Sequence, residues 1–274
     1  MTSPAAASAR ADSALLAALA DAALAAGTVI MRIRAEGCAA QAKADLSPVT
    51  AADLAAEELL RAALHRLLPG VPVIAEEAVA QGRGEAPADS FVLVDPLDGT
   101  REFLSDNGEF TVNIALIEQG RPALGIVYAP AVGRLYAGRP GAGAFRAERA
   151  PGAPAEPAGW TPIRCRPAPA RGLVAAVSRS HLDAATEAFL ADFEIAERIS
   201  RGSALKFGLV AEGRADLYPR LGTVCEWDVA AGHALIVAAG GSVTRPDGTP
   251  LPYGRRDAAY RVPAFIARGA PAAA

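Results

Sequence analysis

The chain has 274 residues, of which 51% are hydrophobic and 21% charged, with 27 basic and 30 acidic side chains. This composition can bury a sizeable core, which excludes a mainly disordered chain. The formal net charge of −3 provides no strong basic field, so we expect no nucleic-acid polymer as a partner. The three cysteines are far apart and form no CxxC pair, which excludes a disulfide framework and a cysteine-rich zinc site.

The beginning of the chain is predicted to be helical. Residues 1–11 are small and polar and are expected to be frayed. Apolar residues at helical spacing predict a helix from Asp12 to Glu36. Asp12 and Asp21 interrupt the apolar run, so we expect neither a cleaved signal peptide nor a transmembrane segment. We therefore expect a cytoplasmic protein; peripheral attachment to the cytoplasmic face of the inner membrane is left open.

The rest of the chain alternates between predicted strands and helices. Six prolines between Arg149 and Pro169 mark the best candidate boundary, which gives an N-terminal half at residues 12–150 and a C-terminal half at 151–274. The mixture favours a layered α/β or α+β architecture. Further helices are expected after Pro48, from Leu182, over Ser203–Glu212 and over Asp228–Ala239, and strands over Val71–Ala75, Phe91–Val94, Phe110–Glu118, Leu124–Tyr128, Arg134–Ala137, Gly172–Ser178, Phe193–Ile199, Ala215–Tyr218, near Val243 and over Val262–Ala267.

Acidic residues stand at the ends of several apolar segments. Converging carboxylates repel one another unless a cation lies between them. Oxygen ligands with no Cys or His cluster nearby favour Mg²⁺ over Zn²⁺. The acidic positions are Asp53, Glu76 with Glu77, Asp95 with Asp98, and Asp228.

The segment from Asp95 to Thr100 is the most informative one. Carboxylates at Asp95 and Asp98 can bridge two metal ions about 3.5–4 Å apart, a spacing used for in-line phosphoryl displacement. The Leu97 carbonyl can point at a cation, and Gly99 lets the backbone approach a phosphate closely. Thr100 offers a hydroxyl that can orient water. The alternative is an ordinary turn, since Asp-Pro and Asp-Gly are both turn formers.

Four motifs occur in a recognisable order along the chain: PVTAAD, AEE, VDPLDGTREF after an apolar strand, and EWDVAAG near the C-terminal end. Together they resemble the inositol monophosphatase superfamily, whose members are Mg²⁺-dependent, lithium-inhibited phosphatases. The resemblance covers about residues 12–267. It implies a layered αβαβα fold of the sugar-phosphatase type, with most of the metal site in the N-terminal half.

The resemblance also implies a ligand set for Mg²⁺. Glu76, Asp95 and the Leu97 carbonyl correspond to the ligands of one ion. Asp95, Asp98 and Asp228 correspond to the ligands of a second, and a third ion is left open. Asp228 would also serve as the N-cap of its helix without any metal.

The catalytic roles are implied by the same motifs. Thr100 resembles the residue that orients the attacking water together with Glu76, and Asp53 is similar to the acid that supports this threonine. Asp53 also forms a capping-box-like pair with Thr50 at the start of its helix; capping alone is the alternative, and the two roles are compatible. The phosphate to be cleaved would meet the backbone amides of 97–100 near a helix start.

The substrate class depends on other segments: Asn107 to Pro130, SRSH ending at His181, Gly202 to Gly222, and the Glu226 before Trp227. These segments look like the bacterial 3'(2'),5'-bisphosphate nucleotidases of the CysQ type. Inositol phosphatases carry an acid where this chain has Arg220, whereas a nucleotide with a second phosphate favours cations. Arg220, Lys206 and His181 are therefore expected to contact the nucleotide, with Ser203 and Ala204 close to its phosphate or base. Lys206 as a solvated charge and His181 as a turn residue are the alternatives.

The resemblance thus implies a phosphatase that removes the 3'-phosphate of adenosine 3',5'-bisphosphate in sulfur assimilation; action on its sulfate-bearing form is left open. An inositol or fructose bisphosphate phosphatase of the same superfamily is the first alternative. A metal-binding regulatory protein without catalysis is the second. Whether the chain forms a homodimer is left open.

Overall fold

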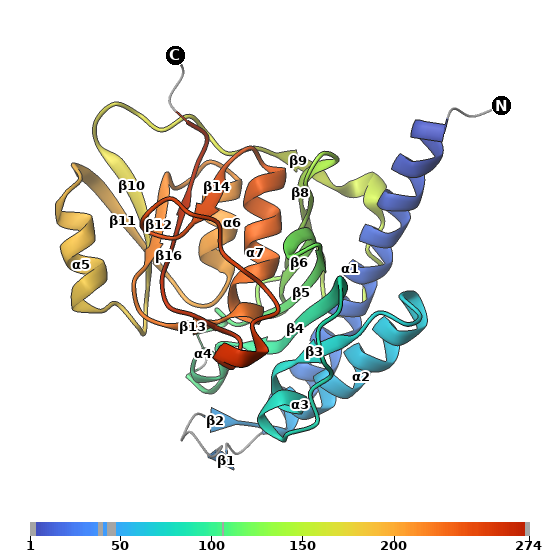
Figure 1. Ribbon diagram of the computed structural model, residues 1–274. Helices are drawn as coiled ribbons and strands as arrows, with labels where there is room; N and C mark the ends of the chain where they lie inside the picture. The colour runs from blue at the N-terminus through green and yellow to red at the C-terminus, as the bar shows by residue number, and fades with distance from the viewer. Residues whose placement is uncertain (1–3, 38–40, 43–47, 106, 272–274) are drawn as a thin grey trace.

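The computed structural model describes residues 4–37, 41–42, 48–105 and 107–271. Its elements form five layers (Figure 1). Helices α1 (Pro4–Glu36) and α2 (Ala51–Leu67) cover one face of a seven-stranded sheet. Helices α6 (Leu205–Ala211) and α7 (Glu226–Ala238) separate this sheet from a five-stranded one, whose outer face carries α5 (Ala184–Ala191). The predicted αβαβα arrangement is confirmed.

The seven-stranded sheet has its strands in chain order. The pair β3–β4 is parallel and the other neighbours are antiparallel. β8 and β9 were not predicted, because neither contains a run of large apolar residues; β9 also carries the sheet beyond the predicted boundary at residue 150. The strands are β3 (Val73–Ala75), β4 (Ser90–Asp98), β5 (Thr111–Glu118), β6 (Arg121–Ala129), β7 (Arg134–Arg139), β8 (Gly143–Glu148) and β9 (Thr161–Ile163).

The five-stranded sheet has the order β11-β10-β12-β16-β14. β10 is parallel to β11 and β12, and β16 is antiparallel to β12 and β14. The strands are β10 (Leu173–Ser178), β11 (Ile195–Arg201), β12 (Leu217–Arg220), β14 (Ser242–Thr244) and β16 (Phe265–Arg268). Two small pairs join β1 (Gln41–Ala42) to β2 (Pro48–Val49) and β13 (Val224–Cys225) to β15 (Arg261–Val262). Short helices α3 (Glu76–Ala80) and α4 (Thr100–Leu104) flank β4 in the sequence.

The core follows the alternation along the strands. The alternation of apolar residues over 110–118 predicts that Val112, Ile114 and Leu116 share one face of β5, and in the structure they face the cluster formed with α1 and α2. Ala115 and Ile117, between and beyond them, face the cluster formed with α7 and the second sheet. Both faces of the seven-stranded sheet are therefore buried, which requires a helical layer on each side.

Helix α1 is longer than predicted. It begins at Pro4 instead of near Asp12, so residues 4–11 of the segment expected to be frayed are helical; their alanines favour this state. Within Ser13–Glu36, an 18-residue window has a mean hydropathy of 2.0, so this helix is long and apolar enough to cross a membrane by length and composition alone. Half of its most apolar window is buried, because Leu19, Ala23 and Ile30 pack in the core as in a core helix of a globular protein.

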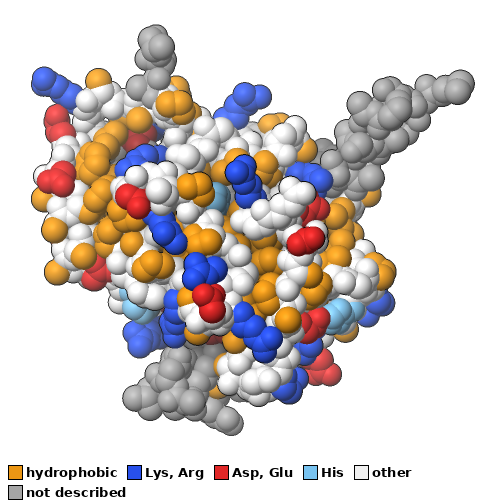
Figure 2. Space-filling model, in the orientation of Figure 1, with side chains coloured by type: hydrophobic (Ala, Val, Ile, Leu, Met, Phe, Trp, Pro, Cys, Tyr) orange, Lys and Arg blue, Asp and Glu red, His pale blue; other side chains and the backbone are white. Residues whose placement is uncertain are grey.

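The surface carries mixed charge. On the face shown in Figure 2, the Lys and Arg side chains of the described residues are interspersed with acidic and apolar ones. This distribution matches the nearly balanced composition. Cys165 is a buried free thiol, Cys225 occupies the N-cap of α7, and Cys38 lies outside the described residues.

Candidate active site

The site is a cleft of about 530 Å³ between the seven-stranded sheet and the elements of the C-terminal half. Its walls come from the junctions β3–α3 and β4–α4, from the ends of β10 and β12, and from the first turns of α6 and α7. All the residues that the sequence predicts as metal ligands line it. So do Gly99, Thr100, His181, Ser203, Lys206 and Arg220, whereas Asp53 lies behind Thr100.

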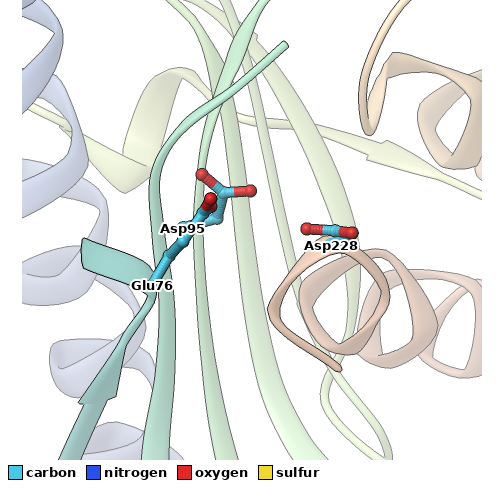
Figure 3. Close-up of side chains that lie close together, drawn as sticks. All are labelled: Glu76, Asp95 and Asp228. Atoms are coloured by element: carbon cyan, nitrogen blue, oxygen red, sulfur yellow. The ribbon is translucent and has the colours of Figure 1, made fainter. Parts of the chain in front are cut away.

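Three carboxylates converge in the cleft. Glu76, Asp95 and Asp228 each present an oxygen, and these atoms lie within 4.8 Å of one another. Figure 3 shows Glu76 and Asp95 side by side, with Asp228 facing them from α7. An all-oxygen set of this kind fits a hard divalent cation such as Mg²⁺. The structure therefore contains an acidic cluster suited to a metal ion.

Local structure holds each of these carboxylates. Glu76 begins α3 directly after β3, and Asp95 lies within β4, opposite Asn113 of β5. We expected β4 to end at Val94, but it continues to Asp98, with an irregular register between Asp95 and Asp98. Asp228 was predicted as an N-cap. It is instead the third residue of α7 and accepts a hydrogen bond from the Cys225 N–H at 2.8 Å, because the helix begins earlier, at Glu226.

Burial and mutual repulsion raise the pKa values of these acids. Burial raises the pKa of Asp95 well above its usual range, and the charges of Glu76, Asp98 and Asp228 raise it further. Burial raises the pKa of Asp228 to about 8, and the negative charges of Asp98 and Glu76 contribute to this shift. Without a cation the site is thus costly to ionise fully, which is the electrostatic signature of a cation-binding cluster.

Asp98 and Leu97 lie beside this cluster. Asp98 is not part of the group of three among the described residues. Its Oδ2 accepts long hydrogen bonds of 3.4 Å from Thr111 and Asn113. Burial raises its pKa to about 6, although Lys206 and Asn113 oppose the shift. The N–H of Leu97 donates to Asp95 Oδ1 at 3.0 Å, which engages that amide and orients the Asp95 carboxylate.

Thr100 and Asp53 meet across the fold. Asp53 Oδ2 accepts hydrogen bonds from the N–H and hydroxyl of Thr50, which is the predicted capping box of α2. Its other oxygen, Oδ1, lies 3.3 Å from the Thr100 hydroxyl. The two roles were expected to be compatible, and both sets of contacts are present in the structure.

Gly99 and Ser203 bring the two halves of the chain into close contact. Gly99 has φ +90°, and a Cβ atom there would lie 2.2 Å from the Ser203 hydroxyl oxygen. The same hydroxyl donates to the Asp98 carbonyl at 2.8 Å. Only glycine fits this position, both for its backbone angle and for its space.

Basic groups form the opposite wall. Lys206 is 3% exposed, which rules out a solvated charge, and its ammonium donates to the Ser203 carbonyl at 2.6 Å. Burial lowers the pKa of Lys206 to about 8, against the opposing effect of Asp98. Arg220 Nη1 donates to the His181 carbonyl at 2.9 Å, and burial together with Arg220 and Arg101 lowers the pKa of His181.

Sequence reasoning missed several residues at the cleft. Arg101 lines it and places Nη1 3.3 Å from His181 Nε2, and Glu102 accepts a hydrogen bond from Ser180 at 2.6 Å. Both stand inside VDPLDGTREF, so the motif contained them, but nothing in the sequence pairs them with the SRSH segment. Arg261 also lines the cleft, and no pattern in the sequence marks it.

Comparison with known proteins identifies the family to which this fold belongs. Residues 12–268 match the inositol monophosphatase family. The 3'(2'),5'-bisphosphate nucleotidase CysQ of Escherichia coli (strain K12) is 45% identical over 215 residues, covering 78% of this chain and 83% of the relative; that of Buchnera aphidicola is 39% identical, covering 77% and 76%.

Solved structures agree with these matches. CysQ from Bacteroides thetaiotaomicron, a bacterial member of the inositol monophosphatase family, superposes with a TM-score of 0.78 at 37% identity, covering 93% of this chain and 96% of that one. Inositol monophosphatase from Anabaena gives 0.71 at 28% identity, covering 94% and 91%. The chain belongs to the inositol monophosphatase family.

Proposed function

We propose that the protein is a Mg²⁺-dependent 3'(2'),5'-bisphosphate nucleotidase that converts adenosine 3',5'-bisphosphate to AMP and phosphate, and acts in the same way on 3'-phosphoadenylyl sulfate. The observation that carries this proposal is a single cleft that joins a three-carboxylate cluster to a basic wall. The curated relatives that cover most of the chain bear this enzyme's name. In this proposal the protein acts in the cytoplasm, in sulfur assimilation.

The donor set fits magnesium. In this proposal Glu76, Asp95 and Asp228 hold the ion, with the Leu97 carbonyl and Asp98 completing a site for two ions. Bound Mg²⁺ supplies positive charge for the phosphoryl oxygens and lowers the pKa of a coordinated water. The convergence of the three carboxylates, whose oxygens lie within 4.8 Å of one another, supports this assignment.

Around this cluster, the chain's own groups position the reactants. The Thr100 hydroxyl, supported by Asp53 Oδ1, and the Glu76 carboxylate orient the attacking water. Gly99 allows the 3'-phosphate to approach the backbone of 98–100. Because these groups are held by α2, α3 and β4, they are fixed before the substrate arrives. Holding reacting groups in position in advance lowers the activation free energy.

The basic wall binds the part of the substrate that does not react. Arg220 and His181 lie at the ends of β12 and β10, and Arg101 stands beside His181. In this proposal Arg220 pairs with the 5'-phosphate, while Ser203 and Lys206 hold the floor of the pocket near the ribose and base. A guanidinium suits a phosphate better than it suits a neutral polyol, which argues against the inositol alternative.

The test is a substrate panel with Mg²⁺: adenosine 3',5'-bisphosphate, inositol monophosphate and fructose 1,6-bisphosphate, with phosphate release measured under the same conditions. The proposal predicts the highest kcat/KM for the adenosine compound. A higher kcat/KM for inositol monophosphate would reject the nucleotidase assignment and leave the fold untouched.

A further inference from the structure

The carboxylate of Glu109 joins three segments of the chain. Glu109 lies just before β5, in the N-terminal half, and its side chain is 11% exposed. Both its oxygens pair with the Arg179 guanidinium, at 2.8 and 2.9 Å. Oε2 also accepts the Gly202 N–H at 2.7 Å. Bidentate pairing of this kind fixes direction as well as distance.

Arg179 and Gly202 belong to the segments that carry the proposed nucleotide contacts. Arg179 directly follows β10 and stands two residues before His181. Gly202 directly follows β11 and stands beside Ser203. The two strands are parallel neighbours, and the Arg179 N–H donates to the Arg201 carbonyl at 3.1 Å. Glu109 therefore holds the carboxyl ends of two adjacent strands, the edge of a sheet where ligands commonly bind.

The backbone around Gly202 is closely packed. A Cβ atom on Gly202 would lie 2.7 Å from the Glu109 carbonyl oxygen and 2.8 Å from Glu102 Cγ. The next residue, Ser203, has φ +50°, a left-handed conformation that is unfavourable for a residue other than glycine. Its hydroxyl nevertheless reaches the Asp98 carbonyl. The contacts made by Glu109 thus keep a strained segment in place against the β4–α4 junction.

We propose that Glu109 is the positioning residue for the nucleotide: it sets the placement of His181 and Ser203 without touching the substrate. This inference rests on the proposed function. Removing its charge leaves the Arg179 guanidinium without its carboxylate and weakens the acceptor of the Gly202 N–H. The two segments then lose their common anchor. Glu76, Asp95 and Asp228 are held by other elements and keep their arrangement.

The experiment compares Glu109→Gln, Arg179→Gln and the double variant. KM and kcat are measured for adenosine 3',5'-bisphosphate, and Mg²⁺ affinity by calorimetry. Glu109→Gln should raise KM about tenfold, the lower end of the effect of losing a supporting contact, with kcat and Mg²⁺ affinity close to wild type. Arg179 is exposed at 43%, so its variant tests the same pair with less risk to folding. The double variant should have the KM of Glu109→Gln alone, because Arg179 acts through its contact with Glu109, which Glu109→Gln already weakens.

Asp216 provides a matched control. Its carboxylate accepts hydrogen bonds from Nε and Nη2 of Arg166, each at 2.7 Å, and from the Val174 N–H. Like Glu109, it therefore joins an arginine to a backbone amide, but at the opposite end of β10. Asp216→Asn should lower stability and leave KM unchanged. Unchanged KM in Glu109→Gln, an equal rise in Asp216→Asn, or weakened Mg²⁺ binding in Glu109→Gln would overturn the inference. If the wild-type protein does not hydrolyse adenosine 3',5'-bisphosphate, the proposed function is wrong, and the inference that rests on it is wrong too.

Discussion

Burial and neighbouring charge both act on the Asp95 carboxyl group. Asp95 is 2% exposed, and the charges of Glu76, Asp98 and Asp228 add to the effect of burial in raising its pKa. In the metal-free protein burial and these charges therefore favour the protonated form of the Asp95 carboxyl group, and a bound cation would favour the ionised form. Metal binding at this cluster should accordingly release protons and strengthen as the pH rises.

Asp95→Asn should nearly abolish activity and leave the metal-free protein at least as stable as wild type. A raised folded-state pKa stabilises the fold fully below the unfolded value, near 3.8, and this contribution is lost as the pH rises through the folded pKa. Asparagine carries no charge to repel Asp98 and Asp228, whose own pKa values are raised to about 6 and about 8. The free energy of unfolding of Asp95→Asn, relative to that of wild type, should therefore increase between pH 4 and pH 8.

Urea unfolding with a chelator at several pH values measures this difference, and calorimetry measures Mg²⁺ affinity. Normal Mg²⁺ binding and activity in Asp95→Asn would show that the cluster is not the metal site. A stability difference that shrinks with rising pH would contradict the electrostatic account.

Thr100→Ala should lower kcat about a hundredfold, a typical contribution of a group that handles a proton in the transition state, with little change in Mg²⁺ affinity. The hydroxyl of Thr100 contacts Asp53 and is assigned to water, not to the metal. Thr100→Ser keeps the hydroxyl and should recover most of the rate. Equal loss in both variants would assign Thr100 to packing.

Arg220→Ala should raise KM and spare kcat, because the proposed contact is to a phosphate that does not react. The Arg220 side chain already reaches the His181 carbonyl, and its Nε is buried without a hydrogen-bond partner among the described residues. Arg214→Ala, whose guanidinium pairs with Glu212, is the control and should be neutral. A collapse of kcat with constant KM would place Arg220 in the catalytic machinery.

At the scale of elements, α7 connects the two sheets and carries Asp228. It packs directly on β6: a Cβ atom on Gly125 would lie 2.2 Å from the Ala231 carbonyl oxygen, and one on Gly138 of β7 would lie 2.7 Å from Leu235 Cα. Glycines on the sheet therefore allow the helix backbone to approach the strands. This approach sets the depth at which Asp228 enters the cleft.

Gly125→Ala should therefore lower the free energy of unfolding by about 1–3 kcal/mol, as overpacking of a core does. Because the displaced helix carries Asp228, Mg²⁺ affinity should fall as well. Urea unfolding and calorimetry on the same sample test both effects. A stable variant with unchanged Mg²⁺ affinity would show that α7 is not held at this depth by its contact with β6.

The elements that could be predicted are those whose local pattern and tertiary role agree. The Thr50–Asp53 capping box and the alternation of Val112, Ile114 and Leu116 are local signals, and the structure confirms both. The start of α7 was misplaced because Cys225, a residue that rarely caps helices, occupies the N-cap. β8 and β9 were missed because their pairing partners, not their own composition, make them strands.

The same distinction applies to the site. The acidic residues could be recognised because they lie in short motifs, but their distances depend on how β4 and α7 pack. The contacts of Glu109 with Arg179 and Gly202 span long stretches of sequence and left no local trace. Such contacts arise only from the folded arrangement, so single-sequence reasoning has no signal for them.

At the scale of the whole molecule, the five layers place the cleft where the two halves of the chain meet. The N-terminal half supplies Glu76, Asp95 and Thr100, and the C-terminal half supplies Asp228 and the basic wall. The acidic cluster is thus complete only when α7 is seated between the sheets. Both halves of the chain therefore contribute to the proposed chemistry, and the basic wall that faces the acidic cluster comes mainly from the C-terminal half.

The most direct test of this account is phosphorus NMR of adenosine 3',5'-bisphosphate during incubation with the protein and Mg²⁺. The account predicts that the 3'-phosphate resonance disappears, that the 5'-phosphate resonance remains as AMP, and that a chelator stops the reaction. Loss of the 5'-phosphate, or no turnover while Mg²⁺ is bound, would contradict it.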